Sequence, residues 1–194
     1  HLDEQTVKRL EREHDPRFVV PLGLTRFLRD LGIDNSGDLD WWQRIEVADD
    51  VWISVVPSRH FSGRGMCDRN QTLWAGFVIE GSRGPIFFAG DTGFGPHFEE
   101  IREEFGPVEV AMLPIGAYEP RWFMSPVHMN PAEAVRAHEI LEAKRSIGMH
   151  WGTFRLADDG YEEPMRELEA AIAGANPTEP GEFVVPEGGV GVEF

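Results

Sequence analysis

The chain has 194 residues, of which 41% are hydrophobic and 11% aromatic, a composition that excludes a disordered chain and predicts one folded domain over residues 1–194. Its 34 acidic residues outnumber its 18 basic residues and give a formal net charge of −16. Charge of this sign repels phosphate backbones and anionic membrane surfaces, so we predict no nucleic-acid partner.

Cysteine content and hydropathy set two further expectations. The single cysteine, Cys67, cannot form an internal disulfide, which is compatible with a reducing compartment. No apolar run reaches the roughly 20 residues of a membrane-spanning helix, and the sequence shows no signal peptide, so we predict a cytoplasmic protein without a transmembrane segment. The chain starts with His1 rather than with methionine, and we therefore expect native residues upstream of it.

The first half of the chain is predicted to form a helix, a strand and a second helix, followed by an antiparallel hairpin. Val7 and Leu10 share one side of an amphipathic segment, and Gly32 ends the second helix. In chain order we predict a helix over 2–13, a strand over 17–21, a helix over 23–31, a polar turn-like segment over 34–40, strands over 44–47 and 51–56, and a long loop over 58–71.

The second half is predicted to alternate strands and helices. We expect strands over 72–80 and 85–89, a helix over 98–105, a buried strand over 108–114, a helix over 131–143, a strand over 146–149, a helix over 162–173 and an edge strand over 183–185. Pro131 suits the first turn of its helix. Antiparallel strands followed by alternating strands and helices predict an α/β fold in which helices cover sheets.

Four residues indicate a metal centre. His60, Asp91 and His150 each follow an apolar strand, and His128 lies in a proline-flanked loop. A carboxylate at a buried strand end is costly unless it is paired or bound to a cation, and zinc takes both imidazole nitrogen and carboxylate oxygen. A lone histidine at a strand end more often makes an ordinary hydrogen bond, so this hypothesis depends on the four residues together.

Residues beside these four are candidates for substrate binding. Arg64 lies four residues beyond His60 in the polar loop, and a guanidinium matches a phosphate or carboxylate bidentately. Trp122 lies shortly before His128 and can form an apolar wall for an acyl chain or a sugar. A surface salt bridge for Arg64 and core packing for Trp122 are the alternatives.

Four segments resemble motifs of one known superfamily. They are Ser58-Arg59-His60-Phe61-Ser62-Gly63-Arg64, Asn70-Gln71-Thr72-Leu73-Trp74, Phe88-Ala89-Gly90-Asp91-Thr92-Gly93 and Met149-His150-Trp151-Gly152-Thr153-Phe154. In this order they resemble the metallo-β-lactamase superfamily, and within it the branch that contains N-acylphosphatidylethanolamine-hydrolysing phospholipase D. The motif His-x-His-x-Asp-His of that superfamily is absent, and only His1, which is followed by Leu2 and Asp3, looks like its last residue.

The resemblance implies an αβ/βα sandwich, truncated here at the N-terminus, with a two-zinc site. It implies His1, His60, Asp91 and His150 as metal ligands, with Asp91 bridging the two ions. A first metal site that holds only His60 and Asp91 lacks the three protein ligands usual for catalytic zinc. We therefore expect zinc occupancy in this chain to be partial or absent, with one ion at most.

The resemblance also implies the chemistry. A metal-bound hydroxide would act as the nucleophile, with Asp91 and His128 as catalytic residues and with His128 also contacting the substrate. Arg64 and Trp122 are the further predicted substrate contacts. We predict a phosphodiesterase of the phospholipase D type that acts on a small-molecule or phospholipid-like substrate and can form a homo-oligomer. The alternatives are a lactonase or other ester or amide hydrolase of the same superfamily, and a catalytically inactive portion.

Overall fold

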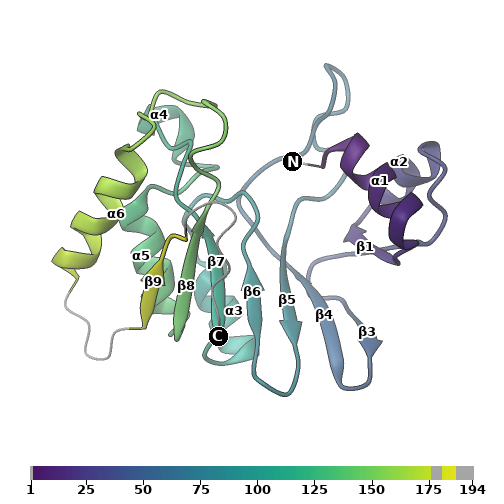
Figure 1. Ribbon diagram of the computed structural model, residues 1–194, viewed down its shortest axis with the longest axis horizontal. Coiled ribbons are helices and arrows are strands. Elements are labelled where there is room, and N and C mark those ends of the chain that lie inside the picture. The colour runs from purple at the N-terminus through teal and green to yellow at the C-terminus, as the bar shows by residue number, and fades with distance from the viewer. Residues whose placement is uncertain (1, 176–180, 187–194) are drawn as a thin grey trace.

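The computed structural model describes residues 2–175 and 181–186. A seven-stranded sheet runs through the molecule, and a smaller unit made by the first 40 residues lies at one end of it (Figure 1). His1, which the sequence predicts as a metal ligand, lies outside the described residues. Within the described residues, no helix combines the length and the apolar character that crossing a membrane requires.

The N-terminal unit contains two helices and a two-stranded parallel sheet. Its elements are α1 (Glu4–His14), β1 (Phe18–Pro21), α2 (Leu24–Asp30) and β2 (Ser36–Leu39). The prediction of a turn over residues 34–40 is wrong, because residues 36–39 pair with β1 as a strand. The Asp38 carboxylate accepts hydrogen bonds from the Gly23 amide at 2.8 Å and the Thr25 hydroxyl at 3.1 Å. The start of α2 thus stabilises a strand whose composition is that of a turn.

The main sheet is mixed. In spatial order its strands are β3 (Arg44–Ala48), β4 (Val51–Val56), β5 (Gly76–Glu80), β6 (Ile86–Phe88), β7 (Val110–Pro114), β8 (Arg145–Met149) and β9 (Glu182–Val184). Neighbours from β3 to β6 are antiparallel and those from β6 to β9 are parallel. It follows that β4, β6, β7 and β8 run in the same direction. Their C-terminal ends share one edge of the sheet, which we call the carboxyl edge.

One predicted strand is shorter than expected. Residues 72–75 do not join β5, because their polar groups bond elsewhere. The Leu73 amide donates to the Leu22 carbonyl at 2.9 Å, and the Trp74 carbonyl accepts from the Trp41 indole at 2.8 Å. These bonds attach the chain before β5 to the N-terminal unit and to the segment before β3.

Helices cover one face of the main sheet. They are α3 (His97–Phe105), α5 (Pro131–Ile140) and α6 (Glu163–Gly174). A further short helix, α4 (Arg121–Met124), was not predicted. Phe98 and Ile101 of α3, Ala134 of α5 and Leu168 of α6 pack with Leu113 of β7 in one buried cluster. Burial of each such Leu, Ile or Phe side chain stabilises the fold by about 1.5–3 kcal/mol.

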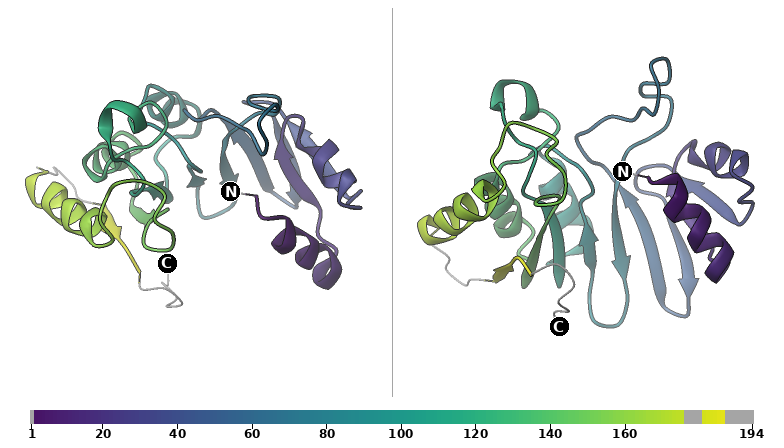
Figure 2. Two further views of the ribbon diagram at one scale, coloured as in Figure 1. Left: turned by 90° about the horizontal axis from the view of Figure 1, so that it is seen from above. Right: turned by 45° about the horizontal axis from the view of Figure 1, so that its top comes forward.

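The N-terminal unit has its own core and lies on the other side of the sheet, as the view from above shows (Figure 2). Val7, Val20, Leu28 and Ile33 form this second buried cluster. A groove separates the unit from strands β3 to β5 and is lined by Arg17, Val19, Val47, Ile53, Phe77 and Ile79. Helices on one side and a helix-bearing unit on the other give the layered arrangement that the sequence predicts. A single domain over residues 1–194 stays a prediction.

Candidate metal centre

The carboxyl edge gathers the residues that the sequence singles out. His60 follows β4 by four residues, Asp91 follows β6 by three, and His150 comes directly after β8. Because these strands run the same way, the three residues emerge at one edge of the sheet although they are far apart in the sequence. The topology alone therefore supports the prediction that they converge.

Side-chain distances give the same result and add His128. Nε2 of His150 lies 3.5 Å from Oδ1 of Asp91. The His128 ring stacks on the His150 ring with centroids 5.3 Å apart and meets the His60 ring edge-on with centroids 5.1 Å apart. Two histidine rings thus flank His128, and one of them also contacts the carboxylate.

The side chains at the carboxyl edge are of the types that bind a divalent ion, but too few of those that the structure describes are arranged around one point. Two ligands of one tetrahedral zinc, each about 2.0–2.1 Å from the ion, lie about 3.4 Å apart, close to the 3.5 Å between Asp91 and His150. Among residues 2–175 and 181–186, however, no three His, Cys, Asp or Glu side chains are arranged so that they can hold a metal ion on their own.

His128 is the most buried imidazole of the group. Burial lowers its pKa from 6.5 to about 4, and the neighbouring rings of His150 and His60 act in the same direction. Its Nδ1 atom is buried and has no hydrogen-bond partner among the described residues. At neutral pH the ring is therefore uncharged, with one N–H that can donate a hydrogen bond and one nitrogen whose electron pair can bind a cation or accept a hydrogen bond.

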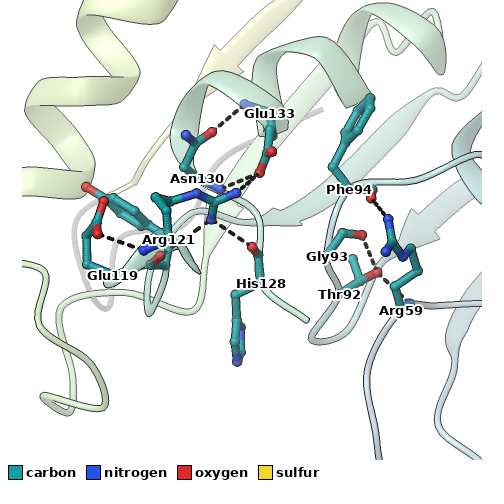
Figure 3. A network of polar contacts seen from close by, with 10 residues as sticks. Arg59, Thr92, Gly93, Phe94, Glu119, Arg121, His128, Asn130 and Glu133 are labelled. Atoms are coloured by element: carbon teal, nitrogen blue, oxygen red, sulfur yellow. Dashed lines mark hydrogen bonds and ion pairs between the residues drawn. The ribbon is translucent and has the colours of Figure 1, made fainter. Parts of the chain in front are cut away.

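The loop that carries His128 is held by Arg121 of α4 (Figure 3). A guanidinium nitrogen of Arg121 donates to the His128 carbonyl at 3.0 Å, and the other end pairs with Glu133 at 2.7 Å. Glu133 and Asn130 form a capping box at the start of α5. Charge-assisted bonds of this kind fix both direction and distance. The sequence analysis missed Arg121, for which the only signal is its place seven residues before His128.

The backbone around His150 is unusual. His150 has a φ of 60°, in the left-handed region that residues with a Cβ seldom adopt. The next loop is fastened by Asp159, whose carboxylate accepts from the amides of Ala117 at 3.2 Å and Tyr118 at 3.1 Å. These bonds join the chain after β8 to the chain after β7. Asp159 is a second residue that the sequence analysis missed.

His97 lies beneath the Asp91 loop and is also buried. Its Nε2 atom is 3.2 Å from the Thr92 hydroxyl. Burial, and secondarily the positive charge of Arg59, lowers the pKa of His97 from 6.5 to about 4. The folded protein therefore keeps His97 neutral at pH values at which the unfolded chain protonates it.

This shift predicts acid sensitivity. Between about pH 6.5 and pH 4 the unfolded chain binds a proton at His97 that the folded chain does not, so stability falls as the pH falls and levels off below about 4. The shift corresponds to about 3 kcal/mol at most. We expect the free energy of unfolding, measured in urea, to fall less between pH 7.5 and pH 5 in His97→Gln than in the parent chain. His14→Gln, at an exposed position, is the control, and an equal loss in all three proteins would contradict the assignment.

The two predicted substrate residues lie differently from the metal candidates. Arg64 donates to the Leu2 carbonyl at 2.7 Å, and its guanidinium carbon lies 4.3 Å from the centre of the Phe27 ring. A substrate phosphate would have to compete with these contacts. Trp122 is 82% exposed on α4, so it is available to a ligand and takes no part in the core. Substrate contact by either residue stays a prediction.

The sequence matches known proteins. Residues 1–151 match the family model described as "Beta-lactamase superfamily domain". The chain is 39% identical over 180 residues to N-acyl-phosphatidylethanolamine-hydrolyzing phospholipase D 1 of Caenorhabditis elegans, in an alignment that covers 87% of the chain and 51% of that protein. It is 42% identical over 197 residues to an uncharacterized protein of Mycobacterium tuberculosis, with coverage of 97% and 52%. The chain spans about half the length of these curated relatives.

The fold also matches solved structures. That of Igni18, described as a novel metallo hydrolase from the hyperthermophilic archaeon Ignicoccus hospitalis, superposes with a TM-score of 0.72 at 22% sequence identity and covers 96% of the chain and 72% of that protein. At this identity the likeness concerns the fold alone. It confirms the predicted αβ/βα sandwich.

Proposed function

Because the chain belongs to the β-lactamase superfamily, whose domain model matches residues 1–151, we propose that it is a metal-dependent hydrolase that cleaves phosphodiester bonds in phospholipid-like substrates. The membership confirms the resemblance found in the motifs around His60, Asp91 and His150. The choice of a phosphodiester is supported by the 39% identity to a protein named as a phospholipase D.

One structural observation carries the proposal. Asp91 and His150 approach within 3.5 Å at the carboxyl edge, with the rings of His128 and His60 beside them. We propose that His60, Asp91 and His150 contribute ligands to a zinc centre to which His1 adds a further one, because imidazole and carboxylate donors suit that ion. A bound zinc lowers the pKa of a water molecule and polarises a phosphoryl oxygen.

The protein's own residues then have separate tasks. Asp91 supplies the negative charge at the centre, and His150 lies against it. His128 is held neutral by burial, so its ring can donate one hydrogen bond and accept another at the edge of the centre. Arg121 keeps the His128 backbone in place through the carbonyl. The exposed Trp122 ring offers an apolar surface to an acyl chain.

A substrate comparison tests the proposal. The purified chain is treated with a chelator, reloaded with zinc, and assayed on bis(4-nitrophenyl) phosphate and on a simple lactone. We expect zinc-dependent turnover with a higher kcat/KM for the phosphodiester. A preference for the lactone would assign the chain to the ester hydrolases of the superfamily, and zinc-independent or absent turnover on both would refute the proposal.

Arg64 allows a sharper test of substrate choice. If it binds a substrate phosphate, Arg64→Ala loses charge-assisted hydrogen bonds worth about 1.5–3 kcal/mol, which is roughly ten- to a hundredfold in kcat/KM on the phosphodiester only. Arg64→Lys should recover part of this loss, because an ammonium lacks the planar fork. Equal losses on phosphodiester and lactone, with a lower melting temperature, would instead make Arg64 the residue that holds the Leu2 segment.

The one cysteine bears on the location of the protein. Cys67 is free and exposed, which agrees with a reducing cytoplasmic environment. A cytoplasmic location and a homo-oligomer both stay predictions.

A further inference from the structure

We propose that Thr92 is a positioning residue that fixes the spacing of the three loops carrying His60, Asp91 and His128. The inference rests on the proposed function, since it gives Thr92 the task of aligning the metal centre. Thr92 directly follows Asp91 and is completely buried, with no exposed surface. Neither its hydroxyl nor its backbone carbonyl is available to solvent or to a substrate.

The Thr92 hydroxyl holds the His60 loop. Its oxygen accepts a hydrogen bond from the Arg59 amide at 2.9 Å, one residue before His60. The Gly93 amide returns a bond to the Arg59 carbonyl at 2.9 Å, and the Arg59 guanidinium donates to the Phe94 carbonyl. Three bonds therefore join Arg59 to residues 92–94, as Figure 3 shows in part, and the hydroxyl makes the one nearest Asp91.

The Thr92 carbonyl holds the His128 loop. It accepts a hydrogen bond from the Met129 amide at 3.0 Å, one residue after His128. From the far side, Arg121 holds the His128 carbonyl at 3.0 Å. His128 is thus fixed between two anchors, of which one belongs to the Asp91 segment. One residue therefore contacts the immediate chain neighbours of His60 and of His128 and is itself the neighbour of Asp91.

The hydrogen bonds of the hydroxyl can be counted. A threonine hydroxyl donates one hydrogen and accepts two. The hydrogen goes to the Gly93 carbonyl at 2.9 Å, which leaves the two acceptor positions for the Arg59 amide and for Nε2–H of His97 at 3.2 Å. All three positions are then filled. Replacement of the hydroxyl by a methyl group leaves the Arg59 amide, whose hydrogen bond is partly buried, without its acceptor, and an amide shielded from water is costly to leave unpaired. We therefore expect the His60 loop to shift.

Three variants separate positioning from packing. Thr92→Val keeps the volume and removes the hydroxyl, whereas Thr92→Ser keeps the hydroxyl and removes the methyl group. Thr25→Val makes the same change at another nearly buried threonine, whose hydroxyl bonds to Asp38 in the N-terminal unit. The first readout is the set of imidazole resonances of the metal-free protein in nitrogen-15 NMR spectra, with His60 and His128 assigned by single substitutions. The second is the zinc dissociation constant from calorimetry.

We expect the His60 resonances to move in Thr92→Val and to stay at the parent positions in Thr92→Ser and Thr25→Val. The His128 loop keeps its main-chain bond to the Thr92 carbonyl in all three variants, so its resonances should move less, through the edge-on contact with the His60 ring. Zinc affinity should fall about 10- to 100-fold in Thr92→Val only, as for other residues that orient metal ligands. Unchanged resonances in Thr92→Val would overturn the inference. If Thr92→Val does not fold, Thr92→Ser decides: parent-like resonances support a role of the hydroxyl, and displaced ones contradict it. Failure of the parent chain to bind zinc would refute the metal site alone, because the resonances are recorded without metal.

Discussion

Asp91→Asn is expected to abolish zinc-dependent hydrolysis, with a loss in kcat/KM of at least about a thousandfold. The substitution keeps the shape of the side chain but removes the negative charge that faces His150 at 3.5 Å. Stabilisation by a metal ion amounts to several kcal/mol, and each 1.36 kcal/mol is a factor of ten in rate. Calorimetry should show zinc binding weakened in parallel, while the melting temperature stays close to that of the parent chain.

The control for this prediction removes one carboxylate elsewhere. Asp49 is exposed in the turn between β3 and β4, so Asp49→Asn changes the net charge by the same amount and leaves the carboxyl edge untouched. Parent-like activity and zinc affinity are expected of it. Comparable activity in Asp91→Asn and Asp49→Asn would remove Asp91 from the proposed centre.

Elemental analysis of the parent chain counts the zinc ions. Because no set of three ligands is complete among the described residues, we expect elemental analysis of the parent chain to give one equivalent of zinc or less. Two tightly held equivalents would mean that a partner chain or other residues supply ligands, and would contradict the predicted partial occupancy.

Gly116→Ala is expected to reduce kcat/KM by about a hundredfold, because it displaces His150 from Asp91. A Cβ atom on Gly116 would press against the backbone carbonyl of His150 and lie 3.1 Å from Cα of Trp151. Both contacts are with the main chain, which cannot rotate away as a side chain can. A shift of about 1 Å in a reacting group costs about a hundredfold, and overpacking adds about 1–3 kcal/mol of lost stability.

A second glycine provides the control for Gly116→Ala. Gly81 lies in the turn between β5 and β6, where a Cβ would have no neighbour within 4 Å. Gly81→Ala should therefore change stability by less than about 0.5 kcal/mol and leave activity unchanged. The comparison uses kcat/KM and the melting temperature of both variants. Full activity in Gly116→Ala would show that the position of His150 tolerates movement of its backbone.

Most of the secondary structure was predictable because it depends on local patterns. The alternating hairpin strands β3 and β4, the buried strand β7 and the helix that begins at Pro131 all formed at nearly the predicted positions. Residues 34–40 could not be predicted in the same way. Their sequence is that of a turn, and they become a strand only because β1 and the start of α2 satisfy their polar groups.

In the candidate site, too, some features follow from the sequence and others only from the tertiary structure. The sequence alone singles out Asp91 as a candidate, because a carboxylate at the end of an apolar strand is costly without a partner. It also singles out His60 and His150 at strand ends and His128 in a proline-flanked loop as candidates beside it. It also determines the acidity of the chain, on which the prediction of no nucleic-acid partner rests. The tertiary structure alone decides which strand ends meet, since the shared direction of β4, β6 and β8 follows from pairings between distant segments.

The residues that hold the site belong to the tertiary structure as well. Thr92, Arg121 and Asp159 act through hydrogen bonds to backbone groups of other loops. A backbone amide or carbonyl is the same at every position, so no residue type in the sequence reveals which one a side chain will meet. Arg64 is a residue whose type did suggest a role. A guanidinium beside a metal motif suggests a phosphate contact, but in the folded chain it donates to the Leu2 carbonyl.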